Sequence, residues 1–186
     1  MRIVAGELRG RPIRTPEGQD VRPTSDRARQ AIFNILEHAP WSEGVEGRRV
    51  IDLFAGSGAM GLEALSRGAP RCLFVDVSET SMAAVRANLE AFGLDERARL
   101  MRQDATRLGL RHEGRPRFDI AFLDPPYRKD LAGPTLAALH AGGWLAVGAV
   151  VVLERASGEE EITTPGFELL DQRRYGAAEV SFLRPA

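Results

Sequence analysis

Arg49-Val50-Ile51-Asp52-Leu53-Phe54-Ala55-Gly56-Ser57-Gly58-Ala59-Met60-Gly61-Leu62-Glu63-Ala64-Leu65-Ser66-Arg67 is the stretch that decides the fold. It begins with an apolar run of strand length, continues through glycines spaced G-x-G-x-x-G, and ends in a helix-forming segment that Gly68 stops. Glycines in such a turn let the backbone bend tightly and approach a ligand closely. The stretch therefore predicts a strand, a ligand-binding turn and a helix.

Strand-like and helix-like segments alternate after this stretch. Strands are expected at residues 49–54, 71–76, 98–103, 118–123, 149–154, 167–170 and 178–183, and helices at 59–67, 79–92 and 131–140. Repeated strand-helix units favour an α/β fold with a doubly wound, mostly parallel sheet of seven strands. The last two strands have no helix between them, so we expect a terminal hairpin that gives the sheet an antiparallel C-terminal strand.

The N-terminal part reads as a small extension of this domain. Residues 2–15 have the glycine placement of a β-hairpin, and Thr24 or Ser25 can cap an amphipathic helix that ends before Pro40. We therefore divide the chain into a hairpin-plus-helix extension at residues 1–45 and a main domain at residues 46–186.

The extension is also more basic than the remainder of the chain. Residues 1–29 hold seven arginines against four acids, a net charge of +3, which leaves −4 for the remainder because the whole chain has −1. Such asymmetry is typical of a polyanion-binding surface, although a solvated hairpin in an arginine-rich protein is the alternative. The candidate contact residues are Arg2, Arg9, Arg11, Arg14 and Arg22.

Composition limits the class of protein. The chain has 186 residues, 44% hydrophobic and 27% charged, and no apolar run approaches the roughly 18 residues of a membrane span. It starts without a signal-peptide pattern, so we expect a cytoplasmic protein. Cys72 is the single cysteine, which excludes an internal disulfide. The three histidines are far apart in sequence, so no metal site is expected.

Acidic residues stand near the ends of the first three expected strands. Asp76 follows Gly56 by twenty residues, where an acid accepts hydrogen bonds from ribose hydroxyls. Asp52 lies four residues before Gly56, where a carboxylate would repel a pyrophosphate but attract a sulfonium or an α-amino group. Asp104 and the N–H group of Ala105 could contact an adenine edge, although an acid there is also an ordinary N-cap residue. Nicotinamide enzymes share the glycine pattern and remain an alternative.

Asp124-Pro125-Pro126-Tyr127 follows the apolar run 118–123, so it is expected at the carboxyl end of a buried strand. Open α/β sheets bind their ligands at that end. The tetrapeptide offers one carboxylate, one carbonyl on a proline and one aromatic ring. These groups suit a planar ring with an exocyclic amine: two acceptors for its N–H groups and a face for stacking. A strand-ending turn, with Asp124 as a cap and Tyr127 packed, is the alternative.

In this order, Asp52-Leu53-Phe54-Ala55-Gly56-Ser57-Gly58, Asp76, Asp104 and Asp124-Pro125-Pro126-Tyr127 resemble the S-adenosylmethionine-dependent amino-methyltransferases, which are Rossmann-like class I enzymes. Their signature for exocyclic nitrogens is (Asp/Asn)-Pro-Pro-(Tyr/Phe/Trp). Over its whole length the chain resembles the RsmD family, which methylates N2 of a guanine in bacterial 16S rRNA. The narrower match is carried by Arg2-Ile3-Val4-Ala5-Gly6, Arg9-Gly10-Arg11, Arg22-Pro23-Thr24-Ser25-Asp26-Arg27-Ala28-Arg29, Phe33-Asn34 and residues 52–67.

The resemblance implies a function and a set of site residues. The expected reaction is methyl transfer from S-adenosylmethionine to N2 of a guanine in 16S rRNA, naked or in the small ribosomal subunit, with S-adenosylhomocysteine as product and no metal. The implied catalytic residues are Asp124, Pro125 and Tyr127, and the implied cofactor contacts are Asp52, Phe54, Gly56, Gly58, Asp76, Asp104 and Ala105.

Three questions stay open at this point. An N6-adenine methyltransferase acting on DNA or RNA is the alternative within the class, and a nicotinamide-dependent oxidoreductase is the alternative outside it. Arg22 and Thr24 could help to close the cofactor pocket instead of contacting RNA. No separate target-recognition domain fits in 186 residues, which favours a substrate that supplies its own shape, such as a ribosomal subunit. We also expect a monomer.

Overall fold

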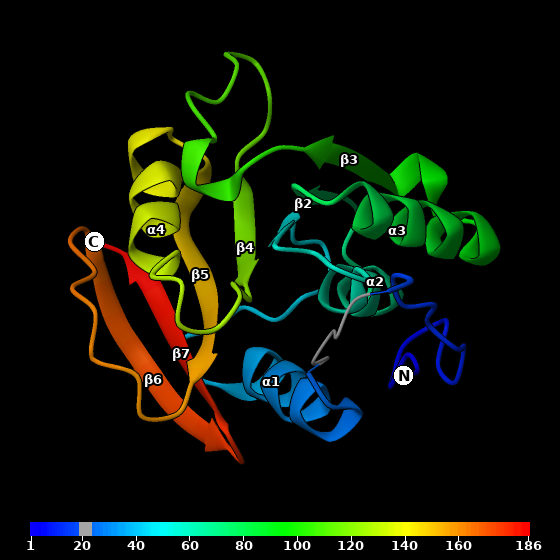
Figure 1. The fold of residues 1–186 in the computed structure, drawn as a ribbon, viewed down its shortest axis with the longest axis horizontal. Helices are drawn as coiled ribbons and strands as arrows, with labels where there is room; N and C mark the ends of the chain where they lie inside the picture. The colour runs from blue at the N-terminus through cyan, green and yellow to red at the C-terminus, as the bar shows by residue number, and fades with distance from the viewer. Residues whose placement is uncertain (19–23) are drawn as a thin grey trace.

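The computed structural model describes residues 1–18 and 24–186 and confirms the predicted α/β class (Figure 1). Its helices are α1 (Asp26–His38), α2 (Ala59–Ser66), α3 (Glu79–Phe92) and α4 (Ala132–Ala141), with short 3-10 helices η1 (Asp95–Arg97) and η2 (Ala105–Arg107). Its strands are β1 (Val50–Leu53), β2 (Cys72–Asp76), β3 (Ala98–Arg102), β4 (Phe118–Leu123), β5 (Leu145–Ala156), β6 (Phe167–Tyr175) and β7 (Ala178–Pro185). Each expected element is present, and β5 and β6 extend well beyond the predicted ranges.

The seven strands form one sheet in the order β3-β2-β1-β4-β5-β7-β6. The pairings from β3 to β5 are parallel, and β7 runs antiparallel between β5 and β6. The predicted doubly wound sheet with an antiparallel C-terminal strand is therefore confirmed. In the central register, Leu53 pairs with Leu123 and Leu123 with Leu153, so β1 and β4 end side by side, next to Leu153 of β5.

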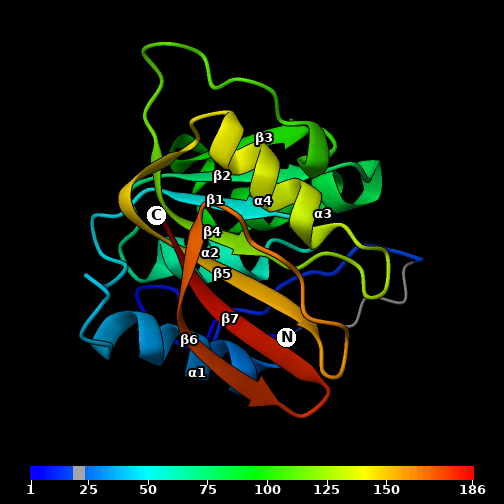
Figure 2. The same ribbon diagram turned by 90° about the vertical axis from the view of Figure 1, so that its left-hand side faces the viewer.

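Helices cover both faces of the sheet, as Figure 2 shows for α1 and α4. Apolar residues of α1, α2 and α3 pack with Val50, Phe74 and Phe122 on one face. Residues of α4 and η2 pack with Ile51, Val75 and other alternate strand positions on the opposite face. Burial on both faces explains why the central strands read as continuous apolar runs in the sequence.

The N-terminal segment doubles back as predicted, with a bridge between Arg2 and Pro12 and backbone hydrogen bonds that include Ile3 N–H to the carbonyl of Arg11 at 2.9 Å. Further backbone N–H groups of the segment donate to side chains of α2. The N–H of Val4 donates to Glu63 Oε1 at 2.8 Å, and the N–H of Leu8 donates to Ser66 Oγ at 3.0 Å. With Ile3 and Ile13 also buried in the core shared with the sheet, residues 1–13 pack as part of the body.

Candidate active site

The glycine turn after β1 has the geometry that its sequence predicts. Gly56 has a φ of +56°, a left-handed conformation that favours glycine, and a side chain there would point into open space. Gly61 plays a different part, because a Cβ at this position would lie 2.7 Å from Cys72 Sγ. The first glycine therefore leaves room for a ligand at the turn, and the last lets α2 pack closely on β2.

Asp52 and Asp76 hold this turn from two neighbouring strands. The N–H of Gly61 donates to Asp52 Oδ2, and the N–H of Gly56 donates to Asp76 Oδ2, both at 2.9 Å. Burial raises the pKa of Asp52 to about 8, and the charge of Asp76 adds to this rise, while the hydrogen bond from Gly61 opposes it. Asp52 is thus a buried acid that a nearby positive charge would ionise.

Asp104 and Phe54 complete the predicted cofactor set. Asp104 is the N-cap of η2: its Oδ1 accepts from Thr106 N at 2.9 Å and from Thr106 Oγ1 at 2.7 Å, and these bonds lower its pKa. Ala105, the next residue, is buried. Phe54 has a φ of +60°, a strained value for a bulky residue, at the point where β1 meets the glycine turn. Such strain is concentrated at binding sites in proteins.

Asp124-Pro125-Pro126-Tyr127 leaves β4 at the same edge of the sheet. Pro125 is buried, whereas Tyr127 is half-buried and donates its hydroxyl to Glu154 Oε1 at 3.2 Å. Burial raises the pKa of Asp124 well above its usual range, and the charges of Glu154 and Asp52 raise it further. Three carboxylates, from β1, β4 and β5, therefore stand close enough to influence one another.

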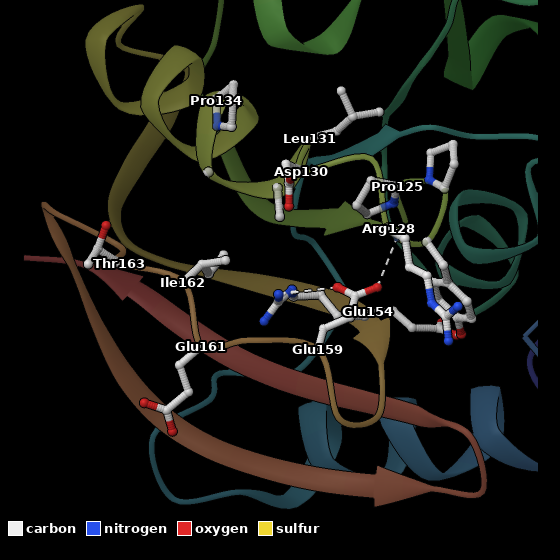
Figure 3. A pocket seen from close by; sticks show the side chains of 15 residues that line it. Pro125, Arg128, Asp130, Leu131, Pro134, Glu154, Glu159, Glu161, Ile162 and Thr163 are labelled. Atoms are coloured by element: carbon white, nitrogen blue, oxygen red, sulfur yellow. Dashed lines mark hydrogen bonds and ion pairs between the residues drawn. The ribbon is translucent and has the colours of Figure 1, made fainter.

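A pocket of about 370 Å³ opens beside this turn (Figure 3). It lies between the connector from β4 to α4 and the connector from β5 to β6, and the two connectors are linked because the N–H of Arg128 donates to Glu159 Oε1 at 3.1 Å. Its size falls within the range of small-molecule sites. Its walls include Pro125, Pro126, Tyr127, Glu154 and Ile162.

A second, larger groove of about 820 Å³ runs along the edge strand β3, and Asp124 is not among the residues that line it. It includes the starts of β3 and β4, and none of the described residues that line it is acidic. Six arginines line it: Arg49, Arg71, Arg97, Arg99, Arg111 and Arg115. Among these six, only Arg97 forms an ion pair within the described part of the chain, with Glu7. This groove is a basic surface that sequence reasoning did not find.

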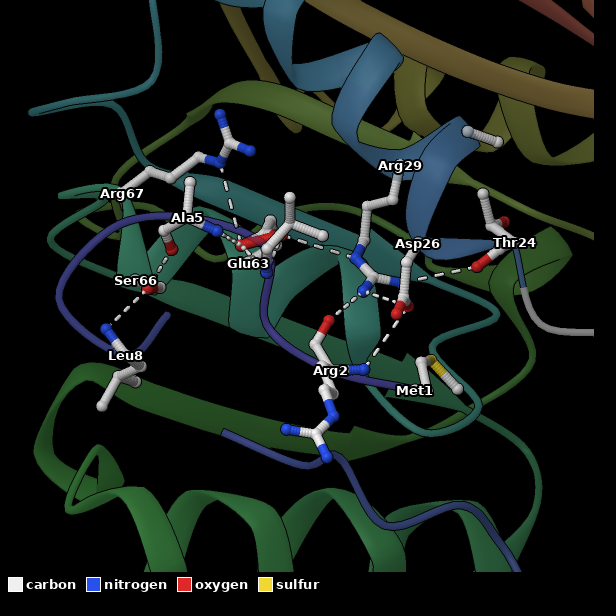
Figure 4. Close-up of polar contacts among 12 residues, drawn as sticks. Met1, Arg2, Ala5, Leu8, Thr24, Asp26, Arg29, Glu63, Ser66 and Arg67 are labelled. Atoms are coloured by element: carbon white, nitrogen blue, oxygen red, sulfur yellow. Dashed lines mark hydrogen bonds and ion pairs between the residues drawn. The ribbon is translucent and has the colours of Figure 1, made fainter. Parts of the chain in front are cut away.

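A buried ion-pair network fastens the N-terminal segment to the site (Figure 4). Arg29 and Glu63 are both fully buried, with Arg29 Nε 3.5 Å from Glu63 Oε1. Arg29 also donates to Asp26 Oδ1 at 2.8 Å, to the carbonyl of Arg2, and to the carbonyl of Thr24 at 3.4 Å. Arg29, one of the seven arginines of residues 1–29, therefore adds no charge to a basic surface, because it is buried and paired with Asp26 and Glu63.

Thr24 and Glu154 are the site residues that sequence reasoning placed least well. Ser25 caps α1 by accepting from the N–H of Ala28 at 3.0 Å, which frees Thr24 to donate its hydroxyl to Glu154 Oε2 at 2.6 Å. Glu154 was given no role, although it follows the apolar run 149–153 as Asp124 follows 118–123. That shared pattern was the available signal. Arg22 lies outside the described residues.

The residues proposed for the amine and for the cofactor thus lie at one edge of the sheet, whereas the candidate RNA-contact arginines of the described chain lie on the N-terminal segment. A glycine turn after β1, acids after β2, β3 and β4, and an antiparallel β7 inserted before β6 define the class I methyltransferase fold. The solved structure of the Escherichia coli protein yhhF, which is described as a methyltransferase, superposes with a TM-score of 0.84 at 28% identity and covers 100% of this chain and 97% of its own.

The sequence comparisons narrow this class to one family. The family model described as "Conserved hypothetical protein 95" matches residues 1–184. Ribosomal RNA small subunit methyltransferase D of Haemophilus influenzae is 32% identical over 178 residues, 95% of this chain and 89% of that protein. Its counterpart of the same name in Escherichia coli strain K12 is 36% identical over 154 residues, covering 83% and 74%. The chain belongs to this family, the RsmD family that its sequence resembles.

Residues 1–18 and 24–186 contain neither a membrane-spanning helix nor a cluster of metal-ligating side chains. No helix there is long and apolar enough to cross a membrane. No group of three or more His, Cys, Asp or Glu side chains in the same residues is arranged to hold a metal ion. Cys72 is a free, buried thiol, and burial raises its pKa well above the usual range.

Proposed function

We propose that this protein transfers a methyl group from S-adenosylmethionine to N2 of a guanine in the 16S rRNA of the small ribosomal subunit. The observation that carries this proposal is the position of Asp124, Pro125 and Tyr127 directly after the carboxyl end of β4, with Pro125 and Tyr127 on the wall of a pocket. The family relationship to ribosomal RNA small subunit methyltransferases D supports the substrate. We further propose that it acts in the cytoplasm as a monomer.

The residues at the sheet edge fit a cationic cofactor. Acids stand near the ends of four successive strands. A sulfonium or an α-amino group would favour the ionised form of those whose pKa is raised by burial, Asp52 and Asp124, whereas a pyrophosphate would be repelled by ionised acids. Gly56 leaves open space for the ligand at the turn. S-adenosylmethionine, when bound, supplies an electrophilic methyl group. The residues that would hold it are Asp52, Phe54, Gly56, Gly58, Asp76, Asp104 and Ala105.

The chain's own groups then prepare the amine. Asp124 and the carbonyl of Pro125 accept its two N–H groups, which turns the nitrogen lone pair toward the methyl donor. Asp124 stabilises the positive charge that develops on nitrogen and receives the proton. The step needs the ionised form of Asp124. Burial raises the pKa of Asp124, which makes its carboxylate a stronger base for this proton, and the positive charge of a bound sulfonium would favour that ionised form. Tyr127 stacks on the base, which contributes about 1–3 kcal/mol by analogy with single-strand binding.

Cofactor affinity should increase between pH 6 and pH 8. The pKa of Asp52 in the folded protein is about 8, and the ionised form attracts a cation, so binding should release a proton. The raised pKa of Asp52 also makes the free protein less stable as pH rises from 6 to 8. In this range the folded protein keeps a proton on Asp52 that the unfolded chain has already lost, so rising pH favours the unfolded chain. Calorimetric titration in buffers of different ionisation enthalpy measures both the affinity and the released protons.

Asp52→Asn should remove most of this pH dependence and weaken cofactor binding, whereas Glu90→Gln, at an exposed site on α3, should change neither. An Asp52→Asn protein with the wild-type affinity and the wild-type proton release would contradict a contact between Asp52 and the cofactor.

The RNA contacts proposed for the N-terminal arm rest mainly on Arg9 and Arg14. Both are exposed, and their side chains make no hydrogen bond or ion pair within the described residues. Arg2 and Arg11 are exposed but bound in place: Arg2 donates to the carbonyl of Gly10, and Arg11 donates to the carbonyl of Ala91. Deleting the arm would expose the core, so single side chains are the proper test.

Replacing Arg9 and Arg14 together by Gln should weaken RNA binding and reduce its dependence on salt. In a plot of the logarithm of the association constant against the logarithm of salt concentration, each neutralised phosphate of a single strand contributes about −0.7 to the slope. The loss of two contacts should therefore make the slope less steep by about 1.4. Dissociation constants measured over a range of salt concentrations check this. The paired variant Arg99→Gln with Arg115→Gln tests the second groove. A reduced slope in that variant alone would place the RNA on the groove instead of the arm.

The proposed reaction is tested by transfer of a labelled methyl group to small ribosomal subunits, naked rRNA and DNA in parallel. Analysis of the nucleosides should show N2-methylguanosine in the rRNA. N6-methyladenosine would indicate the adenine alternative, and the absence of transfer to every substrate would contradict a methyltransferase. Equilibrium binding of S-adenosylmethionine and of a nicotinamide cofactor separates the oxidoreductase alternative without any substrate.

A further inference from the structure

Glu154 is a buried carboxylate at the active-site edge to which the mechanism above gives no part. Its exposed fraction is 8%, and it lies in β5 directly after Leu153, the partner of Leu123 in β4. The residues that follow this pair, Asp124 and Glu154, therefore stand side by side at the sheet edge. Glu154 also lines the pocket together with Pro125 and Tyr127.

Glu154 is fixed in one orientation by two hydroxyl donors. Thr24 donates to Oε2 at 2.6 Å, and Tyr127 donates to Oε1 at 3.2 Å. Thr24 is in turn tied to the core, because Arg29 donates to its carbonyl. Each carboxylate oxygen has two lone pairs, so one acceptor position on each oxygen has no donor among residues 1–18 and 24–186.

We propose that Glu154 is a specificity-determining residue that accepts the N1–H of the target guanine, while Asp124 and the Pro125 carbonyl accept the N2 amine. This inference rests on the proposed function. Guanine carries two neighbouring kinds of donor on one edge, N1–H and the N2 amine, and adjacent acceptors on β4 and β5 match that pair. Adenine has a lone pair on N1 beside its amine, which would face a carboxylate. Glu154 would thus favour guanine and reject adenine.

A purely structural role of Glu154 and a role in base recognition predict different results when Glu154 is replaced. If it only joins Thr24 and Tyr127 to the sheet, its replacement should impair every substrate equally. If it accepts N1–H, its replacement should change the ratio between substrates that have and lack this hydrogen. The ratio of activities on the two kinds of substrate distinguishes a structural role from acceptance of N1–H, because a general loss of folding or of cofactor binding lowers both activities by the same factor.

The experiment compares two RNAs that differ at the target base, one with guanine and one with 2-aminopurine, which keeps the C2 amine but has no hydrogen on N1. For the wild-type protein we expect kcat/KM to be about 10- to 100-fold lower on 2-aminopurine, the usual effect of losing a hydrogen bond to a charged group. Glu154→Gln should reduce this discrimination to a few-fold. Glu161→Gln, which removes an exposed acid from the same pocket, should keep the wild-type ratio.

A second readout does not depend on methyl transfer. Fluorescence of the 2-aminopurine RNA follows its binding, and competition by the guanine RNA gives the ratio of dissociation constants, which should favour guanine in the wild type and less so in Glu154→Gln. The proposal is overturned if the wild type treats the two bases alike, if Glu154→Gln keeps the full discrimination, or if the methylated base is adenine. If the wild type methylates neither RNA, the proposed function fails, and the binding ratio still decides whether N1–H is recognised.

Discussion

Asp124→Asn should lower the rate of methyl transfer by about 10²- to 10⁴-fold, the usual contribution of a positioned acid or base. Asparagine has nearly the same shape, so the turn into Pro125 should be preserved. It carries no charge to stabilise the developing cation and is not a base for its proton. S-adenosylmethionine should still bind, because the glycine turn and Asp76 are unchanged. Single-turnover rates with saturating cofactor, together with a cofactor binding curve, measure the two effects separately.

A matched control lies on the same connector. Asp130 is an exposed acid that lines the same pocket, and its left-handed backbone suits asparagine. Asp130→Asn makes the same chemical change without touching the proposed amine site and should leave turnover near the wild-type value. Near-normal turnover in Asp124→Asn would show that this carboxylate does not act on the amine.

Glu63→Ala should lower the free energy of unfolding by about 3–5 kcal/mol, the typical effect of breaking a buried ion pair. The change leaves the guanidinium of Arg29 buried without this carboxylate, and it removes the acceptor for the N–H groups of Val4 and Ala5. Denaturant unfolding measures the loss. Glu90→Ala, an exposed glutamate on α3, should change stability by only a few tenths of a kcal/mol.

A double replacement tests the reason for this loss. Arg29→Met with Glu63→Leu removes both charges and fills the space with apolar side chains, so it should recover much of the stability. The double variant should still impair activity, because Thr24 loses the guanidinium bond that helps to hold it near Glu154. If Glu63→Ala proves as mild as Glu90→Ala, the network is not what fixes the N-terminal segment.

The local pattern of the chain was enough to predict most of the fold. Strand 118–123 and helix 79–92 were placed at their observed bounds, because alternating β-α units leave a periodic record of burial in each segment. The N-terminal hairpin was predicted less well. Its glycines do reverse the chain and its two arms share backbone hydrogen bonds, but the N–H groups of Val4 and Leu8 donate to Glu63 and Ser66 of α2. A partner 58 residues away in sequence leaves no mark in the local pattern.

The sequence by itself determined the sheet, the glycine turn and the acids at the ends of the strands. Each of these follows from short-range chemistry, because glycine permits a tight turn, proline ends a strand, and a run of apolar residues forms a buried strand. Only the tertiary structure decided which charges serve the site. It buried Arg29 against Glu63, raised the pKa of Asp52 and Asp124 by removing water, and set Glu154 beside Asp124. Burial and the distances between side chains are properties of the packed chain, so they arise only when remote segments meet.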